Sequence, residues 1–219
     1  GQDLHRILQN RKDKLFGVLN GIDYGEFDPA RDPGLPKQFN HTNIHRKAQN
    51  KEALQKFFHL ENNPNACVIS MASRISEQKG FDILLPIMPA LMQLETQFVF
   101  LGDGDKEYLK QLAKLIKHYP KRIAHASYYE TADKETLLYA GGDLAMFPSR
   151  FEPCGTGQLK SMRYGCIPVA REIGGLSDTV TDVDTGDEHS NGFVFKNYDS
   201  YSFLAALSRA YAHFHHPIT

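Results

Sequence analysis

Short apolar runs alternate with segments of helical periodicity over most of this chain, and no other feature constrains its fold so strongly. Six runs of four or five residues have the length of strands, and most of them are apolar: 67–71, 98–101, 122–125, 144–147, 167–170 and 192–195. Helices are predicted around and between them, at residues 51–60, 80–94, 105–118, 133–140, 156–164 and 199–213. Strands that alternate with helices build a parallel sheet. The predicted fold class is therefore α/β, a Rossmann-like parallel sheet with helices on both faces.

The first 60 residues follow this alternation less closely. Residues 1–23 predict a short helix that runs into a strand at 15–19, with a turn at 20–23. Residues 28–50 are rich in Pro, Asn, Gln and charged residues and predict a loop. With 219 residues the chain can bury the core of one domain, although length alone also permits two small ones. We predict a single domain that spans residues 1–219.

Charge and cysteine content narrow the classes of partner. The 25 basic and 26 acidic residues nearly cancel, so no field of one sign attracts nucleic acid or an anionic membrane, and we expect neither as a partner. No apolar run approaches the length of a membrane span. Cys67, Cys154 and Cys166 are too scattered for a disulfide framework or a zinc site. This usage favours a reducing, cytoplasmic compartment.

Ligands of parallel α/β sheets bind beyond the carboxyl ends of the strands, so the loops that follow strands carry the most information. The loop after the strand at 67–71 contains Arg74 and Lys79. Two cations there suit a diphosphate, because arginine can bind phosphate oxygens in pairs and lysine adds a point charge. The alternative is a solvated loop with ordinary surface cations, which is the commoner case for such a loop taken alone.

The next strand ends in Gly102-Asp103-Gly104-Asp105. The glycines permit close approach of the backbone to a ligand. An Asp-x-Asp pair can hold a divalent ion, but Asp105 is better interpreted as the N-cap of the following helix, and no third oxygen ligand is evident nearby. We therefore predict no metal site.

The most informative stretch is the loop at residues 148–158, between a buried strand and a helix. Glu152 follows the strand directly, where burial is costly without hydrogen-bond partners, and sugar hydroxyls are one source of them. Gly155 and Gly157 free the backbone for close approach, and the helix start at Thr156 offers N–H groups to a phosphate. A capped helix after a tight turn explains the glycines but not Glu152. Cys154 is interpreted as a small packing residue rather than a nucleophile.

Two further features lie at the same sheet edge. Gly174 and Gly175 form a second glycine turn, for which a ligand loop and a plain connection are equally good interpretations. Tyr128 and Tyr129 follow the strand at 122–125, and either ring could cover a nucleobase, although simple packing is the commoner role.

Together these residues resemble the bacterial glycogen synthases and plant starch synthases. The resemblance rests on Arg74 with Gln78-Lys79-Gly80, on Ser149-Arg150-Phe151-Glu152-Pro153-Cys154-Gly155, on Met162-Arg163-Tyr164-Gly165 and on the stretch from Gly174 to Val180. It covers essentially the whole chain, in order. The resemblance implies a retaining glycosyltransferase of the GT-B fold that transfers glucose from ADP-glucose to the non-reducing end of an α-1,4-glucan, in the cytoplasm or, in a plant, in the plastid.

The chain resembles the C-terminal, nucleotide-sugar-binding half of that fold. By resemblance, Arg74 and Lys79 neutralise the diphosphate and Glu152 holds the glucose hydroxyls. Backbone N–H groups of Thr156 and Gly157 hold the distal phosphate, Tyr128 stacks on adenine, and Cys154, Gly155, Gly174 and Gly175 belong to the substrate-binding site. No metal or other cofactor is implied. The N-terminal acceptor domain, with its Lys-x-Gly-Gly-Leu motif, is absent from this sequence, so we expect the isolated chain to be inactive.

The residues leave alternatives open. Thr156 and Gly157 stand where many family members have Leu and a polar residue, so side-chain contacts there do not carry over. A related transferase that uses UDP-glucose and a non-catalytic nucleotide-sugar-binding module both fit the same loops. A Rossmann dehydrogenase fits less well, because Gly-x-Gly-x-x-Gly is missing after the first strand.

Overall fold

In the computed structural model, which describes residues 4–131 and 134–216, a single six-stranded parallel sheet organises the chain. The strand order is β3-β2-β1-β4-β5-β6, and every neighbouring pair is parallel. The strands are β1 (Cys67–Ala72), β2 (Thr96–Leu101), β3 (Ile123–Ala126), β4 (Leu144–Phe147), β5 (Ile167–Arg171) and β6 (Phe193–Phe195). This order confirms the predicted α/β, Rossmann-like class.

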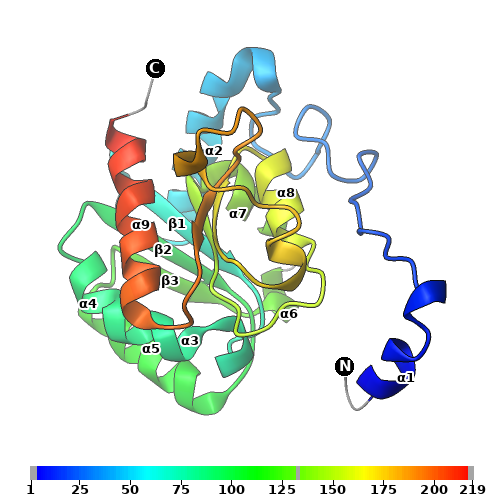
Figure 1. The fold of residues 1–219 in the computed structure, drawn as a ribbon. Coiled ribbons are helices and arrows are strands. Elements are labelled where there is room, and N and C mark those ends of the chain that lie inside the picture. Colours follow the sequence, from blue (N-terminus) through cyan, green and yellow to red (C-terminus); the bar gives the residue numbers. More distant parts are fainter. Residues whose placement is uncertain (1–3, 132–133, 217–219) are drawn as a thin grey trace.

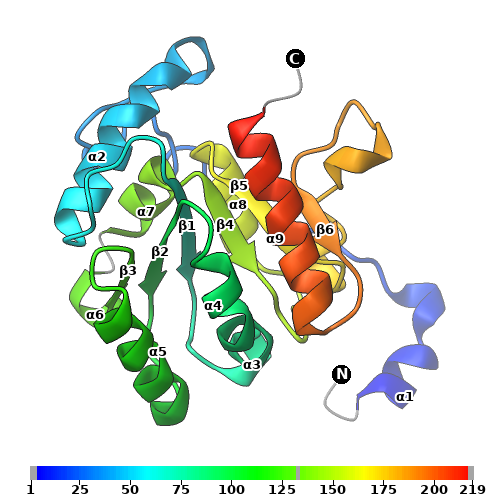
Figure 2. The same cartoon turned by 90° about the vertical axis from the view of Figure 1, so that its left-hand side faces the viewer.

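Helices cover both faces of the sheet (Figures 1 and 2). The α-helices are α1 (His5–Gln9), α2 (Lys47–Phe57), α3 (Phe81–Leu84), α4 (Met88–Leu91), α5 (Lys106–His118), α6 (Tyr128–Thr131), α7 (Glu135–Gly141), α8 (Gly157–Arg163) and α9 (Ser200–His215). The 3-10 helices are at Lys12–Lys14, His41–Arg46, Glu77–Lys79, Leu85–Ile87, Gly174–Leu176 and Val183–Thr185. Helices α3, α4, α5 and α9 pack on one face, and α2, α7 and α8 pack on the other.

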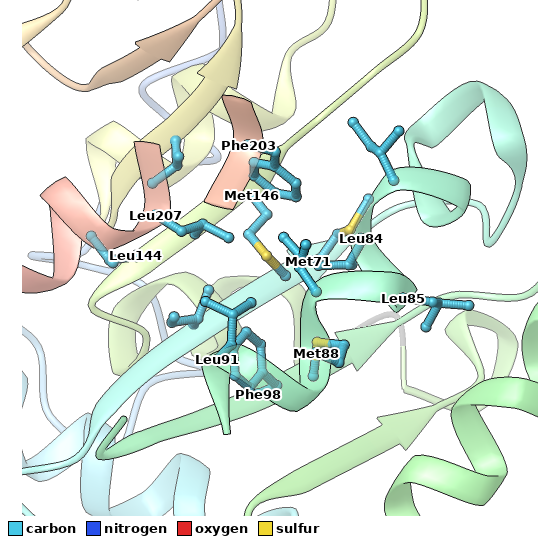
Figure 3. Packing of buried hydrophobic residues seen from close by; sticks show 14 of the residues in the cluster. Met71, Leu84, Leu85, Met88, Leu91, Phe98, Leu144, Met146, Phe203 and Leu207 are labelled. Carbon is cyan, nitrogen blue, oxygen red and sulfur yellow. The ribbon is translucent and has the colours of Figure 1, made fainter. Parts of the chain in front are cut away.

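Successive side chains of a strand point to opposite faces of the sheet, and both faces are packed. Cys67, Ile69 and Met71 of β1 belong to the larger core cluster, whereas Val68 belongs to the cluster on the opposite face. Figure 3 shows the larger cluster, in which Phe98 of β2 and Met146 of β4 pack with side chains from α4 and α9. Because both faces are buried, the strands are apolar at successive positions instead of alternating.

The prediction of a strand at residues 15–19 is wrong. The segment has no strand structure and pairs with none of the six strands, and Phe16 and Val18 are 90% and 91% exposed. It extends away from the sheet together with α1 (Figure 1). An isolated apolar run becomes a stable strand only when a neighbour satisfies its backbone groups, and the described residues offer none here. The turn predicted at 20–23 begins instead at Tyr24, where the Asp23 carboxylate accepts a hydrogen bond from Gly25 N at 2.7 Å.

The other departures concern helix bounds. The helix predicted at 80–94 is interrupted by the 3-10 turn between α3 and α4, because Pro86 and Pro89 cannot donate the backbone hydrogen bonds of a continuous helix. Helix α2 begins four residues earlier than predicted, directly after a 3-10 helix within the predicted loop. Helix α7 begins at Glu135, and position 133 of that prediction lies outside the described residues. Helix α6 was not predicted.

Candidate functional site

A cavity of about 840 Å³ opens at the carboxyl ends of β1, β2 and β4. Loops from four parts of the chain form its wall: Ser73, Arg74 and Lys79 after β1; Gly102, Asp103 and Gly104 after β2; Tyr128, Tyr129 and Glu135 after β3; and Ser149, Glu152, Gly155, Thr156, Gly157 and Gln158 after β4. Seven of the ten residues predicted for the site are in this wall, and Cys154, Gly174 and Gly175 are not. The volume suits a nucleotide-sized ligand.

An ion pair between Lys79 and Glu152 joins two sides of the cavity. Lys79 Nζ contacts Glu152 Oε2, and Ser149 Oγ donates a hydrogen bond to the same oxygen at 3.2 Å. The Lys79 and Glu152 side chains are 22% and 12% exposed. The partners that Glu152 requires are thus supplied within the chain, not only by a ligand. None of the described residues hydrogen-bonds the second oxygen, Oε1, so Glu152 retains acceptor capacity.

Close backbone packing holds the loops of Lys79 and Glu152 together. Gly80 has φ +84°, and a Cβ atom there would lie 2.2 Å from the carbonyl oxygen of Pro148. Arg150 N donates to the carbonyl of Gln78 at 2.8 Å, and the Arg150 side chain forms an ion pair with Glu77. Only glycine permits this approach and conformation together. The backbones that carry Lys79 and Glu152 are therefore held close to each other.

Arg74 lies at the exposed margin of the same wall. Its guanidinium donates to Gln78 Oε1 at 2.7 Å, and no carboxylate among the described residues forms an ion pair with it. A solvated guanidinium contributes less to anion binding than a partly buried ammonium, because water screens its charge. We expect Lys79 to contribute more than Arg74 to the binding of any anion in this cavity.

Gly174 and Gly175 pack behind the Glu152 loop. Gly174 has φ +49°, and a Cβ atom there would lie 1.9 Å from the carbonyl oxygen of Glu152. A Cβ atom at Gly175 would lie 1.9 Å from the carbonyl oxygen of Cys154, and Gly175 N donates to Glu152 O at 3.1 Å. These glycines position the loop that carries Glu152.

Gln158 is a cavity residue that the sequence did not indicate. It is 1% exposed, and its Nε2 donates to the Gly155 carbonyl at 3.1 Å and to Thr179 Oγ1 at 3.1 Å. Thr179 Oγ1 in turn donates to the Gly175 carbonyl at 2.7 Å. Gln158 therefore ties the glycine turn at 155 to the one at 175. Its Oε1 is buried and has no partner among the described residues.

Asp103 positions a tyrosine. Its Oδ2 accepts from Ser127 Oγ at 3.0 Å and from Tyr128 N at 2.9 Å. Asp105 occupies the N-cap position of α5, as predicted, but its side chain makes no capping hydrogen bond. Within residues 4–131 and 134–216, no three His, Cys, Asp or Glu side chains are grouped as metal ligands.

Glu135, a residue of the cavity wall, forms an unpredicted ion pair beside Tyr128. Lys160 Nζ lies 3.0 Å from Glu135 Oε2, and Tyr128 Oη donates to the same oxygen at 3.4 Å. The pKa of Tyr128 is raised, mainly by the negative charge of the Glu135 carboxylate and to a smaller extent by partial burial. Tyr128 is 41% exposed and Tyr129 is 91% exposed, so both rings are available on the cavity wall for stacking.

A substitution at Gly174 tests the support of this loop. We expect Gly174→Ala to lower the free energy of unfolding by about 1–2 kcal/mol more than Gly186→Ala. Gly186 has φ +72°, but a Cβ atom there would meet nothing within 4 Å, so it provides the same backbone strain without the contact to Glu152. Urea unfolding of both variants measures the difference. Equal losses would show that Gly174 does not support the loop.

Comparison with known proteins assigns the family. The sequence profile described as "Glycosyl transferases group 1" matches residues 66–213. The chain belongs to the group 1 glycosyltransferases. It is 41% identical over 211 residues to a glycogen synthase of Desulforudis audaxviator, an alignment that covers 96% of this chain and 42% of the relative. The resemblance to glycogen and starch synthases is thereby confirmed.

Solved structures agree with this assignment. The catalytic domain of starch synthase IV from Arabidopsis thaliana, solved with ADP and acarbose, has a TM-score of 0.88 and 34% identity, covering 96% of this chain and 44% of that one. The C-terminal domain of a group 1 glycosyltransferase from Francisella tularensis has a TM-score of 0.63 and 18% identity, covering 88% of both chains, and shows the shared fold alone. The chain thus spans less than half the length of the glycogen and starch synthases that it matches. No helix in the described part of this glycosyltransferase chain is long and apolar enough to cross a membrane.

Proposed function

We propose that this chain is the donor-binding part of a glucan synthase that uses ADP-glucose. The observation that carries the proposal is the Lys79–Glu152 pair in the wall of the cavity between β1 and β4. The pair places a cation for a diphosphate next to a carboxylate that can accept hydrogen bonds from sugar hydroxyls. The glycogen synthase relative and the ADP-bound starch synthase support this choice of ligand.

The cavity wall contains cations and backbone N–H groups that could stabilise the charge formed during glucosyl transfer. Transfer breaks the bond between glucose C1 and a diphosphate oxygen, and the electron pair of that bond goes to the diphosphate. Lys79, Arg74 and the backbone N–H groups of Thr156 and Gly157 would stabilise the added negative charge, an interaction that strengthens as the bond breaks. Glu152 would hold the glucose while C1 forms its new bond to a hydroxyl oxygen at the non-reducing end of an α-1,4-glucan. The proton of that hydroxyl would pass to the departing diphosphate oxygen.

The acceptor site belongs, in this proposal, to a further domain of a longer protein. Support comes from the extent of the match, since this chain covers 42% of the glycogen synthase and 44% of the starch synthase chain. The three cysteines are free thiols, which supports placement in the cytoplasm, or in a plastid if the protein comes from a plant.

Binding and transfer can be measured on the chain as it stands. We expect the 219-residue chain to bind ADP and ADP-glucose weakly, because a cleft with one wall does not close over its ligand, and to transfer no glucose to glycogen. Calorimetric titration measures the first, and incorporation of radiolabelled glucose into glycogen measures the second. Binding of UDP-glucose in preference to ADP-glucose, or robust synthesis by this chain alone, would contradict the proposal.

A further inference from the structure

The ion pair between Glu135 and Lys160 contacts two parts of the cavity wall, Tyr128 and the backbone at Thr156. Lys160 is one turn into α8, where its N–H donates to Thr156 O at 3.0 Å. Glu135, at the start of α7, accepts hydrogen bonds from both Lys160 and Tyr128. Glu135 therefore connects the Thr156–Gly157 backbone with the Tyr128 ring.

This order matches the order of groups in a nucleoside diphosphate. If the phosphate lies near Thr156 and Gly157 and the base on Tyr128, the ribose lies between them and next to Glu135. The chemistry of the side chain agrees with that position. A carboxylate oxygen is a strong acceptor, and the vicinal 2′- and 3′-hydroxyls of a ribose are two donors close enough together to reach the same carboxylate.

Glu135 retains capacity for such a ligand. Both of its hydrogen bonds within the described residues go to Oε2, and none goes to Oε1. The residue is in the cavity wall, and its side chain is 16% exposed. Lys160 is held in place on its other side by the ring of Phe27, whose centroid lies 4.5 Å from Nζ.

We propose that Glu135 is a specificity-determining residue that binds the ribose hydroxyls of the nucleotide, with Lys160 balancing its charge. The inference rests on the proposed donor-binding function and goes beyond it by assigning the ribose contact. Its consequence is discrimination between ribonucleotides and 2′-deoxyribonucleotides. Tyr128, which shares the Glu135 oxygen, couples the position of the ribose to that of the base.

The ratio of two affinities tests this assignment. We expect wild-type chain to bind ADP about tenfold more tightly than 2′-deoxy-ADP, the usual effect of one hydrogen bond to a charged group. Glu135→Gln should reduce the ratio to about two- to threefold, and Glu135→Ala should bring it close to one. Lys160→Met keeps the carboxylate and should keep a ratio above fivefold, or about half the wild-type value. Glu52→Gln, at an exposed position outside the cavity wall, is the matched control and should leave the ratio unchanged.

Three results of these affinity measurements would overturn the inference, and each has a different meaning. A wild-type ratio near one, or an unchanged ratio in Glu135→Ala, would show that Glu135 does not bind the ribose, while ADP binding itself would leave the proposed function intact. If Glu135→Ala instead changed the ratio between ADP and inosine 5′-diphosphate, which keeps the ribose and replaces the 6-amino group, the contact would be to the base. Folded wild-type chain that binds no ADP would overturn the proposed function and this inference together.

Discussion

Lys79→Ala should weaken ADP binding by about 1.5–3 kcal/mol, the usual worth of a hydrogen bond to a charged group. Lys79 is 22% exposed and lies in the cavity wall, so its charge is only partly screened by water. Calorimetric titration of ADP measures the loss. Arg74→Ala should cost less, because its guanidinium is exposed. Lys110→Ala, at an exposed site on α5 outside the wall, should have no effect.

Because Lys79 contacts Glu152, the effect of Lys79→Ala on ADP affinity can be interpreted only with a second variant. Lys79→Ala leaves Glu152 without its cation, and an unpaired carboxylate can repel the diphosphate by itself. The loss should therefore be measured again in a Glu152→Gln background. If Lys79 binds the diphosphate directly, most of the loss remains there. If the loss disappears, Lys79 acts only by neutralising Glu152, and its proposed role is wrong.

The second large effect is expected for Glu152→Gln, which should weaken binding of the sugar part of the donor and not of the nucleotide. We expect ADP-glucose affinity to drop by about 1.5–3 kcal/mol, because Glu152 accepts hydrogen bonds from the glucose hydroxyls in this account. ADP has no glucose, so its affinity should not fall, and removal of the carboxylate charge beside Lys79 acts in favour of diphosphate binding. Glu107→Gln, an exposed position on α5, is the matched control and should alter neither ligand.

Much of the fold, and the shared position of Arg74, Lys79 and Glu152 at one sheet edge, follow from local sequence patterns. Apolar runs at β1 and β4 mark buried strands, and a parallel sheet brings their carboxyl ends to one edge. Arg74, Lys79 and Glu152 could be predicted as neighbours for that reason. The run at 15–19 has the same local composition as a strand, but pairing depends on a neighbour that local sequence does not reveal.

The parts that sequence missed depend on contacts between distant residues. Glu135 and Lys160 are 25 positions apart on different helices, and neither residue type stands out where it occurs. Gly174 and Gly175 were recognisable as a glycine turn. Whether such a turn faces a ligand or fills space behind a loop depends on the path of residues 152–154, which only the structure shows. Gln158 resembles an ordinary helix residue in the sequence, and only the structure shows that its buried amide donates to the Gly155 carbonyl and to Thr179 Oγ1.

In the proposed complex Glu152 and Lys79 bind different parts of one donor, the carboxylate binding the sugar and the ammonium binding the diphosphate. The most direct measurement is the ratio of ADP-glucose to ADP affinity in wild type and in Glu152→Gln, titrated under identical conditions. We expect the ratio to fall by about tenfold or more in the variant, without a loss of ADP affinity. An equal loss for both ligands, or an unchanged ratio, would contradict it.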